Sequence, residues 1–81
     1  MLSLRIVTPE RVEYDGAIKS IIVPGTMGSF EVLENHAPII SSLEKGVVEY
    51  TTTAGEKQTL TILGGFIEVQ KNIVSLCVEI I

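Results

Sequence analysis

The chain has 81 residues, 46% of them hydrophobic, and a formal net charge of −4. This length favours a single domain, and the hydrophobic content is that of a folded globular protein. The six basic residues are scattered along the sequence, which argues against a nucleic-acid-binding surface. No apolar run approaches the roughly 20 residues of a membrane span, and no signal or transit peptide is recognisable. We therefore expect a soluble domain without an internal disulfide, since Cys77 is the only cysteine.

Strand patterns recur through the first half of the chain, and no helical pattern is convincing. Strands are expected over residues 2–7, 11–14, 17–23, 28–33 and 39–43. Asp15-Gly16 is a pair typical of tight turns, and it separates the second strand from the third. Pro24-Gly25 ends the third strand, residues 28–33 are short enough for a sheet edge, and residues 34–38 form a loop.

The second half continues this pattern. Strands are expected over residues 47–53, 58–63, 66–70 and 73–80, with a hairpin tip at Ala54-Gly55 and a two-residue turn at Lys71-Asn72. Gly64-Gly65 predicts a bulge or a close approach of two backbones. Cys77 is expected to face a core, as free cysteines usually do. About ten short strands predict an all-β fold, an antiparallel flattened β-sandwich or barrel that occupies residues 1–81 as one domain.

Nucleophilic catalysis needs a base beside a serine, threonine or cysteine, and the candidates here are few. His36 is the only histidine and Asp15 the only aspartate, so we expect no enzyme, although a small hydrolase that uses His36 stays as a hypothesis. Zinc sites need paired His or Cys ligands, and this sequence has one of each, far apart. Glu31 and Glu34 offer carboxylates, but charges in a solvated loop are the simpler interpretation. No cofactor or metal is expected.

Residues 23–38 are the stretch that least resembles a plain strand. Gly25-Thr26-Met27-Gly28 lacks the Lys-Ser/Thr and the following helix of a phosphate-binding loop, so a hairpin-like turn is expected. Met27 at its tip is either an isolated exposed side chain or a contact residue, since methionine adapts well to partner surfaces. His36 either hydrogen-bonds a backbone group or contacts a partner. These observations alone indicate a small acidic β-sandwich that serves as an interaction module.

Several segments together form a pattern that none of them would establish alone. They are Leu4–Glu10, Val12–Gly16, Ile18–Val23, Pro24–Phe30 (P-G-T-M-G-S-F), Asn35–Pro38 (N-H-A-P), Lys45–Val48 and Gly64–Val69 (G-G-F-I-E-V). In this order and spacing, they resemble the N-terminal domain of the epsilon subunit of the rotary ATP synthase, which is called delta in mitochondria.

The resemblance implies a ten-stranded flattened β-sandwich and a non-catalytic subunit of the central stalk. Such a subunit binds the gamma subunit and the ring of membrane c subunits and turns with both, so that ion flow delivers torque to catalytic sites on other chains. It implies no cofactor, no nucleic-acid partner, and a peripheral location on the cytoplasmic face of the bacterial inner membrane. The alternative is an unrelated β-sandwich adaptor that binds another soluble protein.

The resemblance also implies contact residues. The turn that meets the c-ring matches Thr26, Met27, Gly28 and Ser29, with Phe30 behind it. The positions that lie near gamma in the family match Thr8, His36, Ser41 and Leu63.

This sequence departs from the family pattern in two places. Many members carry a glycine at the position of Glu31, and Pro-Gly at the position of Glu34-Asn35, so the shape and charge of this region differ. Members usually continue into a C-terminal helical hairpin that can inhibit ATP hydrolysis and in some binds ATP. Because the sequence stops in the last expected strand, we expect no such hairpin, and no regulation through it if 81 residues is the natural length.

Overall fold

The computed structural model describes residues 1–80, which form seven strands. The strands are β1 (Leu2–Val7), β2 (Val12–Gly25), β3 (Gly28–Val32), β4 (Ile39–Leu43), β5 (Gly46–Thr52), β6 (Lys57–Gln70) and β7 (Ile73–Ile80). No helix occurs among these 80 residues. The expected all-β fold is confirmed, with seven strands in place of about ten.

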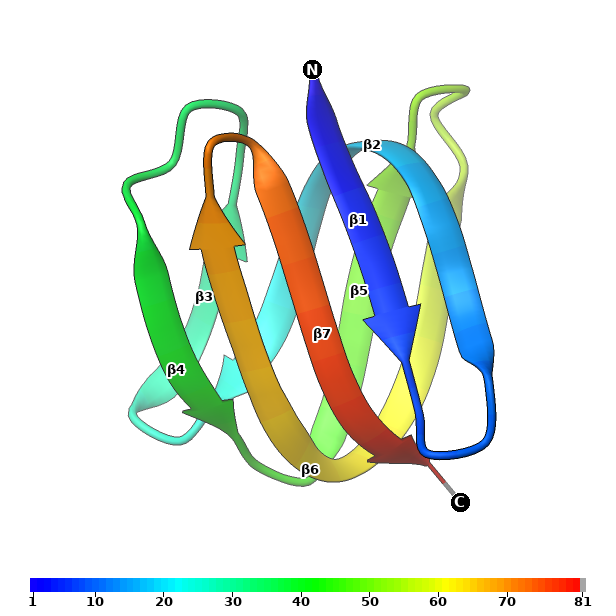
Figure 1. Cartoon of the computed structure of the whole chain (residues 1–81), viewed down its shortest axis with the longest axis vertical. Coiled ribbons are helices and arrows are strands. Elements are labelled where there is room, and N and C mark those ends of the chain that lie inside the picture. Colours follow the sequence, from blue (N-terminus) through cyan, green and yellow to red (C-terminus); the bar gives the residue numbers. More distant parts are fainter. Residues whose placement is uncertain (81) are drawn as a thin grey trace.

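The strands lie in two layers, and β2 and β6 contribute to both because each runs for 14 residues and curves (Figure 1). In the front layer, β7 lies between β1 and the last part of β6, with β4 on the far side of β6 and the first part of β2 beside β1. In the back layer, β5 lies between β2 and β6, and β3 pairs with the end of β2. All pairs are antiparallel except β1 and β7, which run parallel.

The predicted turn at Asp15-Gly16 is wrong, because both residues lie inside β2. Asp15 is paired with Arg5 and Gly16 with Leu4 across the ladder between β1 and β2. The ring of Tyr14 lies over Gly16, where an added Cβ would sit 3.1 Å from the Tyr14 hydroxyl. This glycine therefore makes room for a tyrosine ring and does not reverse the chain. The two strands expected on either side of it are one.

Pro24-Gly25 also lies within β2, at its last two positions, and pairs with Ser29 and Gly28 of β3. The strand does end there, as expected, but the pair belongs to the ladder. β6 likewise joins two expected strands through Gly64-Gly65.

The other turn and bulge predictions are confirmed. Lys71 and Asn72 have φ angles of 50° and 61°, the left-handed geometry of a two-residue hairpin turn. The pairing of β6 with β7 shifts register between Ile62 and Gly64, which is a bulge. Gly65 has φ 148°, and an added Cβ would lie 2.2 Å from the carbonyl oxygen of Cys77. The two backbones thus approach too closely for any side chain at this position.

The core between the layers is aliphatic. Within residues 1–80, the buried side chains are all hydrophobic: Leu2, Leu4, Ile6, Ile18, Ile21, Val23, Val32, Leu43, Val48, Ile62, Ile67, Val69, Val74, Leu76 and Val78. β7 shows the expected alternation, since Val74, Leu76 and Val78 are buried. The expectation that Cys77 faces the core is wrong. Cys77 lies between the buried residues Leu76 and Val78 in β7, so its side chain points the other way and lies half-buried on the outer face of the front layer.

Candidate interaction surfaces

The turn between β2 and β3 presents the most exposed of the large apolar side chains in residues 1–80. The expected hairpin-like turn is confirmed: Gly25 pairs with Gly28, so Thr26 and Met27 are its two central residues. The side chain of Met27 is 98% exposed. The backbone N–H of Thr26 donates to the carbonyl of Ser42 at 3.1 Å, which ties the turn to the end of β4. The other exposed residues here are Gly28 and Ser29.

Phe30 supports this turn from inside. Its ring is half-buried and packs against the core. An added Cβ on Gly25 would lie 2.8 Å from the ring, so the ring covers the last residue of β2. The aromatic side chain therefore stiffens the base of the turn, and Thr26, Met27 and Ser29 lie exposed beyond it.

The turn at Thr26 and Met27 is called the Met27 turn, and the loop of residues 33–38 that follows β3 is called the His36 loop. The two lie at opposite ends of β3 (Figure 1). His36 is half-buried. The backbone N–H of His36 donates to the carbonyl of Leu33 at 3.2 Å, and the ring Nδ1 lies 2.7 Å from the carbonyl oxygen of Ala37. The ring thus hydrogen-bonds the backbone, while its remaining edge is accessible to a partner.

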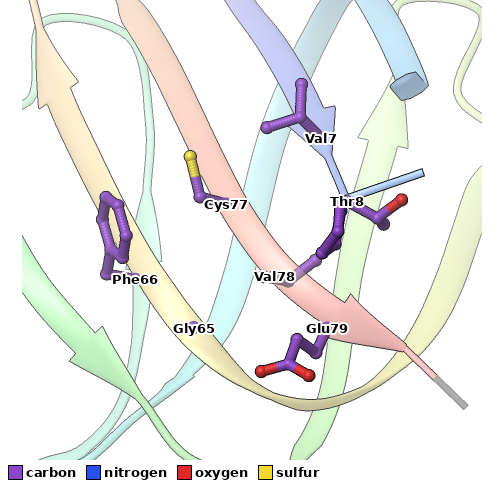
Figure 2. Close-up of a pocket in the computed structure, with 8 residues that line it drawn as sticks. Val7, Thr8, Gly65, Phe66, Cys77, Val78 and Glu79 are labelled. Carbon is purple, nitrogen blue, oxygen red and sulfur yellow. The ribbon is translucent and has the colours of Figure 1, made fainter. Parts of the chain in front are cut away.

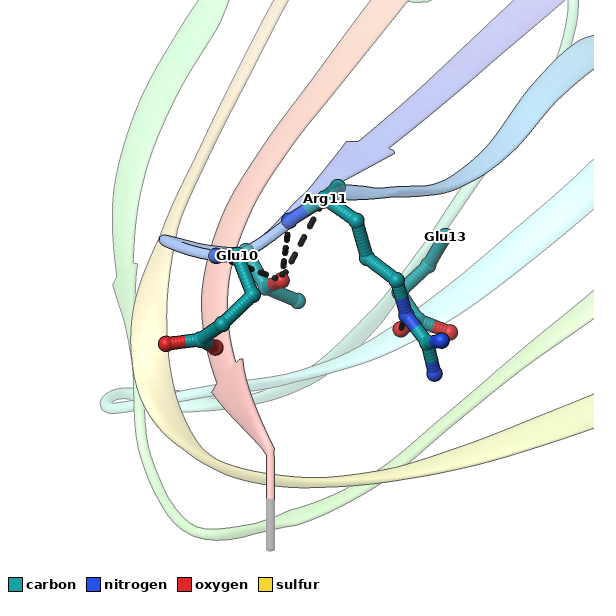
Figure 3. A network of polar contacts seen from close by, with 4 residues as sticks. Glu10, Arg11 and Glu13 are labelled. Atoms are coloured by element: carbon teal, nitrogen blue, oxygen red, sulfur yellow. Dashed lines mark hydrogen bonds and ion pairs between the residues drawn. The ribbon is translucent and has the colours of Figure 1, made fainter.

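Thr8 shapes the turn between β1 and β2 through hydrogen bonds to Glu10 and Arg11, both labelled in Figure 3. Its hydroxyl accepts hydrogen bonds from the backbone N–H groups of Glu10 at 3.3 Å and Arg11 at 3.2 Å, and donates to the carbonyl of Arg11 at 3.1 Å. The guanidinium of Arg11 donates to the carboxylate of Glu13 at 2.7 Å, and this hydrogen bond and charge raise the pKa of Arg11. Because the hydroxyl of Thr8 is occupied within the turn, a partner would meet the other surfaces of that residue.

The four positions assigned to gamma do not form one cluster. His36 lies in the loop between β3 and β4, and Thr8 lies in the connection between β1 and β2 at the opposite end of the sandwich (Figure 1). Ser41 is a half-buried residue of β4 whose hydroxyl donates to the carbonyl of Ser42 at 3.1 Å. Leu63 is 45% exposed at the bulge of β6. A partner that reached all four would have to extend along the domain.

A hollow of about 430 Å³ opens on the outer face of the front layer (Figure 2). Ladder pairs set Phe66 beside Cys77, and Cys77 beside Val7, in one line across three strands. Phe66 is 50% exposed. The remaining lining residues are Thr8, Pro9, Gly65, Val78 and Glu79. We call this feature the Phe66 hollow.

Sequence reasoning missed the Phe66 hollow, although the alternation in β6 carried a signal for it. Ile67 and Val69 are buried, so Phe66 must point to the opposite face of the strand. An aromatic residue at an outward position, opposite a cysteine and a valine on neighbouring strands, marks an apolar outer face. That face also carries the exposed side chains of Ile40 and Ile73.

Neither a metal site nor a membrane span is visible in the part of the chain that the structure describes. No three side chains of His, Cys, Asp or Glu within residues 1–80 come together as ligands. Over the same residues, no helical segment has the length and hydrophobicity needed to cross a bilayer.

The sequence matches one protein family from its first residue to its last. This is the beta-sandwich domain of the ATP synthase delta/epsilon chain, matched over residues 1–81. The chain belongs to this family. The resemblance inferred from the sequence segments is thereby confirmed.

Two curated members of the ATP synthase delta/epsilon family show how much of a relative this chain covers. The ATP synthase epsilon chain of Leptospira borgpetersenii is 40% identical over 79 residues, which are 96% of this chain and 61% of the relative. The ATP synthase epsilon chain of Chlorobaculum tepidum is 40% identical over 77 residues, which are 95% of this chain and 88% of the relative. The chain therefore spans about three fifths of one relative and most of the other.

Solved structures agree on the fold. A chain in the cryo-EM structure of the Euglena gracilis mitochondrial ATP synthase superposes with a TM-score of 0.89 and 22% identity, over 95% of this chain and 49% of that one. A chain in the central stalk and c-ring structure of the Tetrahymena thermophila mitochondrial ATP synthase gives 0.80 and 14% identity, over 96% and 63%. The fold of this chain thus recurs in chains of two mitochondrial ATP synthases.

Proposed function

We propose that this chain is a non-catalytic subunit of the ATP synthase central stalk, which joins the gamma subunit to the c-ring and turns with both. Its relatives are named epsilon chains of ATP synthase, and its fold recurs in structures that contain the central stalk and the c-ring. The domain works without a cofactor. It is held at the cytoplasmic face of the bacterial inner membrane by the complex.

The observation that carries this proposal is the position of two anchored loops at opposite ends of β3. The strand is five residues long, which corresponds to roughly 17 Å. The Met27 turn lies at one end, tied to β4, and the His36 loop lies at the other. A stiff domain with contacts at both ends can hold two partners in a fixed relation. Torque transmission requires that property and no chemistry.

The gamma subunit is the partner that we assign to the Phe66 hollow. Thr8, one of the positions near gamma in the family, lines this hollow together with Phe66 and Cys77. An exposed aromatic side chain beside other apolar residues often dominates the binding energy of a protein interface. We therefore expect gamma to cover the outer face of the front layer.

The test compares the affinities of two glutamate variants of the full chain for purified gamma. Phe66→Glu puts a charge into the Phe66 hollow, whereas Val47→Glu puts the same charge on β5 of the back layer. Phe66 and Val47 are 50% and 52% exposed, so the two changes are matched for their effect on the core. We expect Phe66→Glu to weaken binding to purified gamma by about tenfold or more, since a buried charge is left without a partner. Val47→Glu should leave this affinity within about twofold.

Two results would count against the proposal. If the tagged wild-type chain recovers soluble partners from cells but no ATP synthase subunit, the chain serves as an adaptor outside the ATP synthase. If the two glutamate variants bind gamma equally well, the Phe66 hollow is not the gamma surface, even where the subunit assignment holds.

A further inference from the structure

Asn72, the second residue of the tight turn between β6 and β7, hydrogen-bonds to two other segments of the chain. Its Oδ1 accepts a hydrogen bond from the backbone N–H of Asn35 at 2.6 Å, and its Nδ2 donates to the side-chain oxygen of Asn35 at 3.3 Å. Its backbone carbonyl accepts a hydrogen bond from the N–H of Ser3 at 2.9 Å. One residue thus joins the turn to β1 and to the loop of residues 33–38.

Asn35 needs such a partner because its backbone is unusual. Its φ angle is 67°, in the left-handed region that glycine occupies freely and asparagine tolerates better than most residues. The double hydrogen bond to Asn72 holds both the backbone and the side chain of Asn35 in this conformation. The next residue is His36, so the dihedral angles of Asn35 set the direction in which the histidine leaves the loop.

We propose that Asn72 is a positioning residue for the His36 loop. Its amide keeps Asn35 in the left-handed conformation and thereby fixes the orientation of His36. The two asparagines are 37 positions apart in the sequence, so the shape of the loop is set by a distant hairpin turn and not by its own residues alone. The consequence for gamma binding rests on the proposed function, whereas the hydrogen bonds do not.

The first experiment measures hydrogen exchange of the Asn35 backbone amide by NMR in the full chain. Asn72→Gly keeps the left-handed turn residue and removes both side-chain hydrogen bonds. We expect it to speed exchange of the Asn35 amide by about tenfold, with the Leu76 amide of β7 unchanged as the reference for an intact fold. Lys71→Gly is the matched control, because Lys71 is the neighbouring turn residue with φ 50°, and it should change the Asn35 rate by less than about twofold.

Asn72→Asp provides a second variant that keeps the acceptor oxygen for the Asn35 N–H. Exchange of the Asn35 amide should stay within about threefold of the wild-type rate in this variant, because the acceptor remains. If Asn72→Gly leaves the Asn35 rate unchanged, or if Asn72→Asp or Lys71→Gly accelerates it as much as Asn72→Gly does, the proposal is overturned.

The second experiment measures affinity for purified gamma. Asn72→Gly should weaken binding by about threefold to tenfold, and should cause no further loss in a His36→Ala background, since coupled residues are not additive. Faster exchange of Asn35 with unchanged gamma affinity would overturn the positioning role and leave the proposed function standing. Failure of the wild-type chain to bind gamma would contradict the proposed function, and the exchange rates would still decide whether Asn72 holds the loop.

Discussion

At the scale of single residues, Tyr14 and Tyr50 close one side of the core. They come from β2 and β5, and their ring centroids lie 4.7 Å apart with the planes tilted by 50°. The hydroxyl of Tyr14 donates to the carbonyl of Ala17 at 3.1 Å. Both rings pack against the aliphatic core, which contains no aromatic residue of its own among the described residues.

This pair gives the domain a pH dependence at alkaline pH. Burial raises the pKa of Tyr50 above its usual value near 10, and the charges of Tyr14 and Glu13 raise it further. A group that holds its proton more tightly in the folded state stabilises the fold below the unfolded pKa. This stability is lost as the pH rises through the folded pKa. We therefore expect the free energy of unfolding in urea to fall as the pH rises above about 10.

The control for this pH dependence is Tyr50→Phe, which keeps the ring and removes the titrating hydroxyl. Its unfolding free energy should decline less steeply over the same pH range. Equal slopes for the variant and the wild type would assign the alkaline loss of stability to other groups.

At the scale of elements, local signals predicted the turns better than the extent of the strands. Asn72 and Gly55 have positive φ angles, which asparagine and glycine adopt more readily than most residues, so the sequence shows the turns at Lys71-Asn72 and Ala54-Gly55 directly. The continuation of β2 through Asp15 depends on pairing with Arg5, ten residues earlier, which overrides a local turn preference. Cys77 was misplaced for a similar reason, since composition favours burial but the alternation of β7 sets its direction.

The contact surfaces were predictable in the same uneven way. The exposure of Met27 follows from its place at the tip of a two-residue turn flanked by glycines. The shape of the His36 loop was not predictable, because its partner Asn72 lies 37 positions away. The Phe66 hollow depends on register between three strands, which a single sequence does not specify.

The bulge of β6 makes its own prediction. Gly65→Ala would place a Cβ 2.2 Å from the carbonyl oxygen of Cys77 and 2.8 Å from the Cα of Val78, both backbone atoms that cannot move aside freely. We expect this change to lower the unfolding free energy by about 3 kcal/mol or more. Gly55→Ala is the control, because its φ is also positive, at 89°, but its Cβ would meet open space, and it should cost about 1 kcal/mol. Urea unfolding of both variants gives the comparison, and similar losses would show that the close approach at Gly65 relaxes cheaply.

At the scale of the whole molecule, the proposed contacts lie at separate places on one rigid body. The Met27 turn and the His36 loop lie at opposite ends (Figure 1), and the Phe66 hollow opens on the front layer (Figure 2). The ends are tied together by the strands between them and by a continuous core. Changes at one end should therefore affect one partner without unfolding the domain.

Met27→Glu tests this separation. Because the side chain is 98% exposed, the change should alter the unfolding free energy by no more than about 0.5 kcal/mol. It should nevertheless reduce binding to the c-ring and the coupling of proton or sodium transport to ATP hydrolysis in reconstituted vesicles, and leave gamma affinity unchanged. Ala54→Glu is the control, because Ala54 is exposed at the tip of the hairpin between β5 and β6. It should leave c-ring binding and coupling unchanged. Normal coupling with Met27→Glu would argue against a ring contact at this turn.

The parallel pairing of β1 with β7 has a consequence for biosynthesis. β1 leaves the ribosome some seventy residues before β7, which is one of its two neighbours in the sheet. Until β7 is made, β1 has a free edge on that side, and the core lacks Val74, Leu76 and Val78. Contacts between such distant segments form slowly and late. The nascent domain should therefore remain protease-sensitive until translation has passed the last strand, and chaperones have their longest access to β1 during that interval.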